Sequence, residues 1–574
     1  MTIKLMSTPK KPLGIAAIML SATILAGCGT SSTTPNKVAT TPHTGGTVVV
    51  ALPPATAINW YQPIIGVPYN SLYNVWASHL MYKSLFHINR TGTINYAKSI
   101  ASKISWNTSG TVYTVNLHHK WRWSNGSPVT ASDVAFAWQV IKAASSSQAV
   151  APWPFIDAGS GGIPNLVKSV VVDNPYKLTV TLNQPTNQQW FVYHGLSDLT
   201  PLPKQSWDIY PTSIVKEISY LGSTGNQAGF FKVIDGPFRL SHVTFNQSWT
   251  FVPNTRYNGH KPYINKLIFA YETGDAAEFT SLLQGTTQVG YLPFSMYGSL
   301  AQLKNDQMVA SPTYDVYRTI LTYKNPQYAS IFQQLPVREA LQMSINQPAI
   351  IASIYHGLAK PGIGPVPVYP STYMAPQLSK PVYPYNPQQA IALLKAHGWH
   401  EIGGVMTNHQ GQRLSFSLIY PSGSTTSQDV VEIVQSDWKK IGVQVSLKSM
   451  PFLNILGLHH QYSAWNMMTG LAWNYSQPYP TGGGMYGTGG GYNFFGYSSN
   501  TMNTLIAATH APQPTNQAAQ QALDRYQVFV AKQVPTLFMP VPDQLNVYAK
   551  TVHGVKTTNN IITQLIYPQY WWVQ

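Results

Sequence analysis

Apolar and polar residues alternate in several short stretches of the chain, which is the period of a β-strand with one buried face. The segments 113–117 and 178–182 follow this period, with Tyr, Val and Leu at the apolar positions. The run 47–52 is apolar after its first residue and ends at a pair of prolines, which is typical of a buried strand that leads into a loop. We therefore predict strands at these three places.

Other segments carry apolar residues at helical intervals between capping residues. The segment 130–141 opens with Thr-Ala-Ser-Asp, the spacing of a capping box. The segment 275–285 has the same form, with acidic residues at its start and a glycine at its end. The segment 386–398 opens with Asn-Pro and stops at a glycine. Each of these three segments is predicted to be a helix with one apolar stripe.

The segment 414–447 combines both periods. Its ends, 414–418 and 443–447, alternate as strands do, while 430–441 has helical spacing and is stopped by Gly442. A strand, a helix and a second strand in this order imply a parallel strand pair. Because the roughly 530 residues after position 46 exceed one ordinary core, we expect an α/β protein in which helices cover sheets and the chain is divided into lobes.

The first residues have the pattern of a secretory signal. Lysines are followed by an uncharged apolar run over 13–25, too short to span a bilayer, and then by small residues before Cys28. Leu-Ala-Gly-Cys at 25–28 resembles the lipobox at which bacterial export machinery acylates a cysteine and cleaves before it. We expect a signal peptide over 1–27 and a lipid on Cys28 that anchors the protein to the bilayer. The Ser-, Thr- and Pro-rich stretch 28–46 is expected to be a flexible tether.

Acidic residues are scarce in this chain. It has 35 Lys and Arg against 19 Asp and Glu, a formal net charge of +16, and charged residues make up only 9%, whereas soluble domains have about 25%. No basic block is present, which argues against nucleic acid as a partner. The shortage of acid is consistent with a protein that works in an acidic medium, where surface carboxylates would be protonated.

Motifs for catalysis, cofactors or metals do not stand in the required context. The segment 482–487 matches G-x-G-x-x-G, but it follows no clear strand and opens no helix, so we interpret it as a loop beside a cleft. Histidine pairs occur without HExxH or a cysteine cluster. No serine stands in a nucleophile motif with a strand-turn-helix pattern. We therefore expect no enzyme activity, no cofactor and no metal site.

Four separate blocks of sequence resemble one known family. The densest is WRWSNGSPVTASDVAFAW at 121–138, after the strand 113–117, and the others lie at 236–267, 336–398 and 465–478. Together they resemble the extracellular solute-binding proteins of the oligopeptide and dipeptide type (family 5), which serve ABC importers. The resemblance extends over nearly the whole chain after the tether.

This resemblance implies a two-lobed periplasmic-binding-protein-like fold (class II) with an inserted subdomain in the first lobe. We place lobe I at 47–314, with the insertion at about 80–225. Lobe II is placed at 315–535, and 536–574 is expected to return to lobe I. The lobes are expected to close on a solute by hinge motion.

The resemblance also implies a ligand cleft with aromatic walls. The residues expected there are Trp60 and Tyr61 from one lobe and Trp465, Trp473, Asn474 and Tyr475 from the other. Peptide binders of the family often carry an aspartate at the position of Asn474, whose carboxylate pairs with the amino terminus of the ligand. Asparagine supplies no charge, so either the ligand lacks a free α-amine or the site works where a carboxylate would be protonated.

The function implied is capture of oligopeptides or dipeptides by a lipid-anchored monomer outside the cytoplasm, on the outer face of the membrane or in the periplasm. The captured peptide would be delivered to the permease subunits of an ABC importer. Three alternatives remain open at this point. The solute is a nickel chelate, a glycoside or an opine-like compound; the protein is a peptide sensor that docks on a receptor; or it is a cell-wall enzyme.

Overall fold

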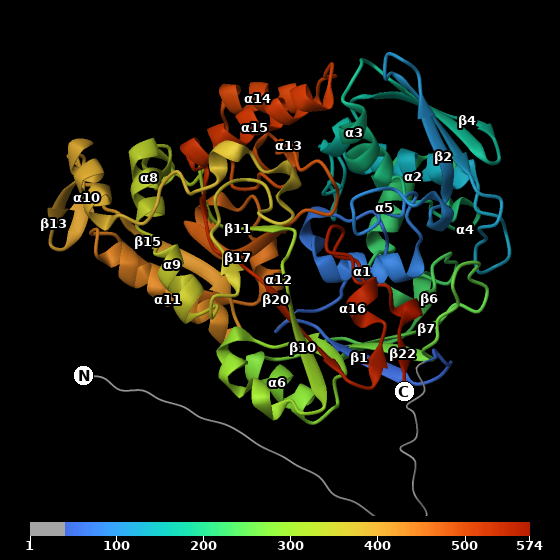
Figure 1. Ribbon diagram of the computed structural model, residues 1–574. Coiled ribbons are helices and arrows are strands. Elements are labelled where there is room, and N and C mark those ends of the chain that lie inside the picture. Colours follow the sequence, from blue (N-terminus) through green and yellow to red (C-terminus); the bar gives the residue numbers. More distant parts are fainter. Residues whose placement is uncertain (1–40, 55) are drawn as a thin grey trace, which may run out of the picture. The chain divides into compact units, whose positions relative to one another are not determined.

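Strands far apart in the sequence come together in three main sheets (Figure 1). The structure is a computed structural model and describes residues 41–54 and 56–574. The predicted signal peptide, Cys28 and most of the tether lie outside the described residues. Residues 42–574 form one compact unit.

The first sheet has seven strands in the order β10-β20-β9-β1-β8-β7-β6. Their bounds are β1 Thr47–Ala51, β6 Phe238–Thr244, β7 Ser248–Pro253, β8 Lys266–Ala270, β9 Val289–Tyr291, β10 Asp306–Ser311 and β20 Gln544–Ala549. The predicted strand at 47–52 is confirmed as β1, which pairs in parallel with both β8 and β9. Helix α6, Asp275–Leu283, connects these two partners of β1.

The second sheet has five strands in the order β16-β15-β17-β11-β18. Their bounds are β11 Asp315–Leu321, β15 Ser415–Pro421, β16 Gln444–Met450, β17 Met467–Asn474 and β18 Thr536–Phe538. Strands β15 and β16 pair in parallel around helix α11, Thr425–Lys439, as the two alternating segments predicted. The longer helices of this part are α8 Leu335–Met343, α9 Gln347–Ser353, α10 Pro387–Ala396, α14 Asn500–His510 and α15 Asn516–Gln533.

The third sheet is antiparallel, with four strands in the order β2-β3-β5-β4. Its strands are β2 Ala101–Trp106, β3 Val112–Leu117, β4 Val167–Asn174 and β5 Lys177–Leu182, and they lie in sequence between β1 and β6. The predicted strands at 113–117 and 178–182 are β3 and β5. Helix α2, Ala131–Ala144, packs on β4 and β5. Helices α1 Leu72–Met81 and α5 Ile214–Thr224 also lie between β1 and β6 in the sequence.

Shorter elements complete the described chain. The two-stranded pairs are β12 Ala359–Lys360 with β19 Val541–Pro542, β13 His400–Ile402 with β14 Val405–Thr407, and β21 Val552–His553 with β22 Trp572–Val573. The short helices are α3 Gln188–Trp190, α4 Lys204–Trp207, α7 Ala329–Phe332, α12 Phe452–Gly457, α13 Gly483–Tyr486 and α16 Val555–Thr558. The glycine-rich segment interpreted as a loop thus contains the single helical turn α13.

Two of the three predicted caps are confirmed. Thr130 and Asp133 form the capping box of α2, and the Asn386 side chain accepts a hydrogen bond from the backbone of Gln389 at the start of α10. At α6 the N-cap is Gly274, and Asp275 is the first helical residue. The Asp275 carboxylate instead accepts hydrogen bonds at the start of α11, so it stabilises the beginning of a helix that belongs to the other sheet.

The chain crosses twice between the seven-stranded and the five-stranded sheet. The first crossing follows β10 at Ser311 and ends at Asp315, where β11 begins. The second lies between β18, which ends at Phe538, and β20, which begins at Gln544. Two large hydrophobic cores result: one joins most of the seven-stranded sheet to the four-stranded sheet, and the other contains the five-stranded sheet together with β20. The lobe boundaries drawn from the sequence stay a prediction.

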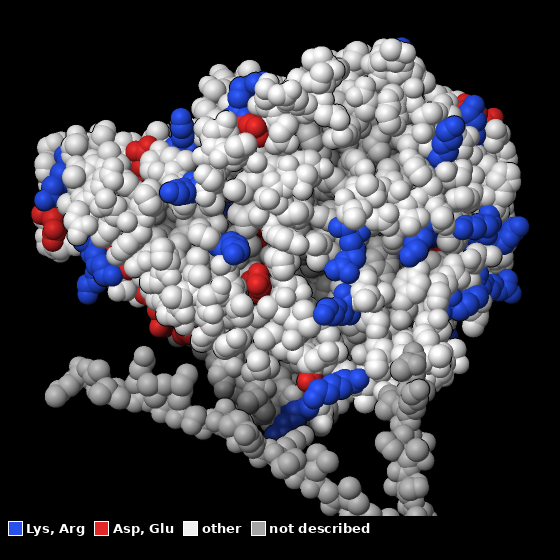
Figure 2. Space-filling model, in the orientation of Figure 1, with Lys and Arg blue, Asp and Glu red and all other residues white. Residues whose placement is uncertain are grey.

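The surface is largely uncharged. Figure 2 shows lysine and arginine side chains scattered over a mainly uncharged face, with few acidic ones among them. Within the described residues, the ion pairs are Lys177–Asp173, Lys204–Asp208 and Lys440–Asp437. None of the described helices has the length and apolar composition needed to span a membrane.

Candidate functional site

A cavity of about 930 Å³ lies where the two crossings join the sheets. Ser311 to Thr313 of the first crossing and Pro542 to Gln544 of the second both line it, together with residues of α1, β11 and β17. Cavities of this size hold ligands as large as short peptides or drug-sized molecules. The cavity is therefore the candidate binding site.

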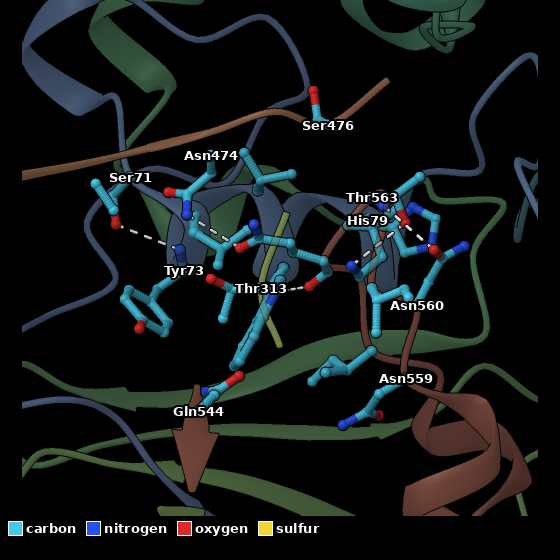
Figure 3. Close-up of a pocket in the computed structure, with 18 of the residues that line it drawn as sticks. Ser71, Tyr73, His79, Thr313, Asn474, Ser476, Gln544, Asn559, Asn560 and Thr563 are labelled. Atoms are coloured by element: carbon cyan, nitrogen blue, oxygen red, sulfur yellow. Dashed lines mark hydrogen bonds between the residues drawn. The ribbon is translucent and has the colours of Figure 1, made fainter. Parts of the chain in front are cut away.

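Uncharged hydrogen-bonding side chains supply much of the wall (Figure 3). They come from the start of α1, from the first crossing, from the end of β17 and from the C-terminal segment. Labelled examples are Ser71, Tyr73, Thr313, Asn474, Ser476, Gln544, Asn559, Asn560 and Thr563. Such a wall can orient a ligand through many neutral hydrogen bonds, with only a few charges fixing its ends.

One carboxylate stands among these neutral groups. Asp315 is only 3% exposed and lines the cavity at the first residue of β11. Its Oδ1 accepts hydrogen bonds from Asn474 Nδ2, at 2.8 Å, and from Gln564 Nε2. Burial raises the pKa of Asp315 to about 6, although the hydrogen bonds from Asn474 and Gln564 oppose the rise.

Trp473 and Asn474, both predicted from the sequence, line the cavity. Asn474 lies opposite Asp315 in the register of β11 and β17. The Trp473 ring meets Tyr492 edge-on, with centroids 3.9 Å apart, and its indole N–H is buried without an acceptor among the described residues. An aromatic face beside an unused donor is suited to an amphipathic ligand.

Arg318 places a buried guanidinium close to the ring of Trp473. Arg318 is 4% exposed and lines the cavity, and its guanidinium is 5.6 Å from the ring centroids of Trp473 and Phe495. The Nε and Nη1 groups have no acceptor among the described residues. Burial lowers the pKa of Arg318, and Tyr486 is the largest influence opposing that change. The aromatic rings therefore stabilise this cation where no carboxylate does.

Four further carboxyl groups line the cavity, those of Asp157, Asp198, Asp275 and Asp543. The first two come from the part that carries the four-stranded sheet. Asp157 Oδ1 accepts a hydrogen bond of 2.7 Å from the hydroxyl of Tyr492, a residue that follows β17 in the chain. Burial raises the pKa of Asp157, and burial together with Asp157 raises that of Asp198 well above its usual value. The Tyr492–Asp157 bond thus links the segment after β17 to the part of the chain that carries the four-stranded sheet.

Basic side chains occupy another part of the wall. The Lys83 ammonium lies 4.5 Å from the ring centroid of Trp121, and burial lowers the pKa of Lys83 to about 8, although Asp235 opposes this. Burial, with Lys83 nearby, lowers the pKa values of His79 and His87 to about 3. Both imidazoles are therefore neutral at physiological pH. No group of three or more His, Cys, Asp or Glu suited to a metal ion occurs in the described part of the chain.

The other four predicted residues do not line the cavity. Trp60 and Tyr61 belong to the hydrophobic core of the first sheet, where the Trp60 ring stacks on Tyr69 at 4.4 Å. Trp465 and Tyr475 belong to the core of the second sheet, and the Tyr475 hydroxyl donates to the carbonyl of Pro365. Their burial in the two cores places them among the packing residues in this structure.

The position of Trp60 leads to a test by substitution at Gly225. A Cβ atom at Gly225 would lie 2.2 Å from the Trp60 ring, so Gly225→Ala must displace the ring. We expect the free energy of unfolding to fall by about 2 kcal/mol in a urea titration, as overpacked cores do. Gly229→Ala is the matched control, because its Cβ would meet nothing within 4 Å. Equal losses in the two variants, or a loss of ligand affinity without a loss of stability, would contradict a core role for Trp60.

Sequence reasoning missed the charged residues of the wall. Asp315 and Arg318 lie in a segment with the composition of a strand, and their contacts come from residues far along the chain. A weak signal was available, since an aspartate at the start of a mainly apolar strand is unusual in a chain with only 19 acidic residues.

The chain is similar to known binding proteins. The family model described as bacterial extracellular solute-binding proteins, family 5 middle, matches residues 95–493. The oligopeptide-binding protein AppA of Bacillus subtilis (strain 168) is 23% identical over 441 residues, which cover 75% of this chain and 74% of that protein. The nickel-binding periplasmic protein of Escherichia coli (strain K12) is 25% identical over 386 residues, covering 65% of this chain and 66% of that protein.

A solved structure shares the fold. The oligopeptide-binding protein AppA from Bacillus subtilis, in complex with a nonapeptide, superposes with a TM-score of 0.79 at 18% sequence identity and covers 93% of this chain and 100% of that chain. This likeness confirms the predicted two-lobed α/β fold. At this identity it does not determine which solute fits the cavity.

Proposed function

Since this chain belongs to the bacterial extracellular solute-binding proteins of family 5, we propose that it captures oligopeptides or dipeptides by lobe closure and delivers them to the permease of an ABC importer. The observation that carries the proposal is the cavity of about 930 Å³ at the two crossings between the sheets. Peptides expose many amide groups, and the neutral donors and acceptors of the wall suit them. Trp473 and Asn474 are proposed as ligand contacts.

The proposal includes the position of the protein in the cell. Family 5 proteins act outside the cytoplasm, and a lipid on Cys28, followed by the tether 28–46, would hold the two lobes close to a permease in the same membrane. We propose lobe I at 47–314, with its insertion, and lobe II at 315–535, followed by the return of 536–574. The mature protein is proposed to act as a monomer without catalytic activity.

A nickel chelate is the second candidate, because His79, His87 and His459 all line the cavity and neutral imidazoles are good nickel ligands. The peptide is preferred because the described histidines do not form a metal site of three or more groups.

Thermal melts with candidate ligands test the proposal. We would purify the protein from residue 29 onward, and record melting curves and native mass spectra from pH 2 to 7 with mixed peptides. A peptide at about 100 times its Kd should add about 2.7 kcal/mol to the free energy of unfolding and raise the melting temperature. A shift with sugars or nickel–histidine, and none with peptides, would assign another solute.

A further inference from the structure

Asp315 is a buried carboxylate whose described partners are all neutral. A buried charge is strongly destabilising unless a counter-charge accompanies it. The amides of Asn474 and Gln564 both donate to Oδ1, which leaves Oδ2 without either bond. Burial raises the pKa of Asp315, as expected for a carboxylate without a cation beside it. Among the described residues, the carboxylate of Asp315 therefore has neutral hydrogen-bond partners and no ion pair.

Arg318 is not the missing cation. It follows Asp315 by three positions on β11, and an odd separation along a strand places two side chains on opposite faces. Its guanidinium is held against the rings of Trp473 and Phe495. The ion pairs of the described chain involve other aspartates. Among the described residues Asp315 therefore has no cationic partner, and a ligand in the cavity can supply one.

The position of Asp315 suits a ligand anchor. It is the first residue after the crossing from the seven-stranded sheet, and the cavity is formed at this junction. Asn474 holds the carboxylate from the neighbouring strand β17, and Gln564 holds it from the C-terminal segment. Figure 3 shows Asn474 and Thr313 at the same cavity. A carboxylate fixed in this way loses little conformational freedom when it binds.

We propose that Asp315 is the anionic anchor of the cavity and forms an ion pair with a protonated primary amine of the ligand. The inference rests on the proposed capture of peptides, in which this amine is the N-terminal α-amine or a lysine side chain. Asn474 and Gln564 are positioning residues, because they donate to the carboxylate and carry no charge. The absence of a charge at Asn474 is thus compatible with a ligand that has a free amine.

A double-mutant cycle between protein and peptide tests the anchor. One peptide without lysine is prepared with a free and with an acetylated N-terminus, and its Kd is measured by calorimetry on wild type and Asp315→Asn. Acetylation should weaken binding to wild type by about 30-fold or more, since one partner of a buried charge pair is lost. It should weaken binding to Asp315→Asn by less than about threefold, because the partner is already absent.

Asp235→Asn is the matched control variant. Asp235 is 1% exposed, burial raises its pKa to about 7, and it is not among the residues that line the cavity. The substitution has the same shape and the same loss of charge, and it should leave the effect of acetylation unchanged. A peptide acetylated at its N-terminus that contains one lysine distinguishes the two sources of the amine.

The results separate the anchor from the proposed function. If peptides bind wild type equally well with and without any free amine, the proposed ion pair with Asp315 is wrong, while the proposed capture of peptides is supported. If no peptide binds, peptide capture fails, and the ligand that copurifies decides on the anchor. A copurified ligand without a primary amine in its mass spectrum would overturn it, and one with an amine whose occupancy falls at least tenfold in Asp315→Asn would support it.

Discussion

Replacing Asp315 by asparagine is expected to raise the free energy of unfolding, relative to wild type, by about 2 kcal/mol more at pH 7 than at pH 4. Burial raises the pKa of Asp315 to about 6 in the folded protein, against about 3.9 in an unfolded chain. A carboxyl with a raised pKa contributes stability below pH 3.9, and this contribution is lost as the pH rises through 6. Asparagine does not titrate, so at this position the variant's free energy of unfolding does not fall as the pH rises.

Urea unfolding of the ligand-free proteins at several pH values measures this difference. The titratable groups that face Asp315 are Tyr73 on α1 and Tyr317 on β11, and burial raises the pKa values of both, so they stay neutral throughout. Any effect of the substitution on shape is common to all pH values and cancels in the comparison. A difference that stays constant from pH 4 to 7 would show that the Asp315 carboxyl titrates as an exposed one does.

The same titration affects binding. If a ligand amine pairs only with the ionised carboxylate, its affinity should rise by about tenfold per pH unit toward pH 6 and then level off. In an acidic medium Asp315 is largely protonated without ligand, and binding must release its proton. The scarcity of acidic residues is consistent with work in an acidic medium. A carboxyl pKa near 6 at Asp315 would, however, make capture weaker in acid and stronger near neutrality.

The sequence predicted the fold well because the relevant signals are local. The alternation at 113–117 needs only neighbouring residues, and so does the Asn-Pro start of α10. The parallel pair β15 and β16 was predictable because α11 separates its strands by a short distance in the chain. Asp275 was an exception, since its carboxylate serves a helix 150 residues further on.

The site was predicted less well because it is made of non-local contacts. Asn474 and Gln564 are separated from Asp315 by 159 and 249 residues, and no local period reveals such a junction. Aromatic residues were a poor guide, because Phe, Trp and Tyr are abundant and serve both as core and as cavity wall. Trp473 lines the cavity while Trp465, on the same segment, fills the core.

Asp275 is expected to stabilise the contact between α6 and α11. Helix α6 connects two strands of the seven-stranded sheet, and α11 connects two strands of the five-stranded sheet. Its Oδ2 accepts hydrogen bonds from the backbone of Thr425 at 2.9 Å and from the hydroxyl of Ser295 at 3.1 Å. Thr426 and Ser424 are at 3.4 Å from the same oxygen. The residue is 3% exposed, so water replaces few of these bonds when the carboxylate is removed.

Asp275→Ala should therefore lower the free energy of unfolding by about 3 kcal/mol, because it leaves buried donors at the start of α11 without their charged acceptor. Asp275→Asn keeps an acceptor oxygen and loses only the charge, and about 1 kcal/mol is expected for it. Urea unfolding at pH 7 measures both values. Equal losses in the two variants would mean that the charge, rather than the hydrogen-bond acceptor, is what matters at this position.

The Asp275→Ala variant also shows whether the contact between α6 and α11 affects closing of the lobes as well as the free energy of unfolding. If the α6–α11 contact also favours the closed arrangement, Asp275→Ala should weaken ligand binding in proportion to the lost closed population, and small-angle scattering should show a larger radius of gyration without ligand. If affinity and radius stay at their wild-type values while stability falls, the contact exists equally in the open and closed arrangements. In that case α6 and α11 move together, and the hinge must lie in the two crossings beside Asp315 and Gln544 rather than between these helices.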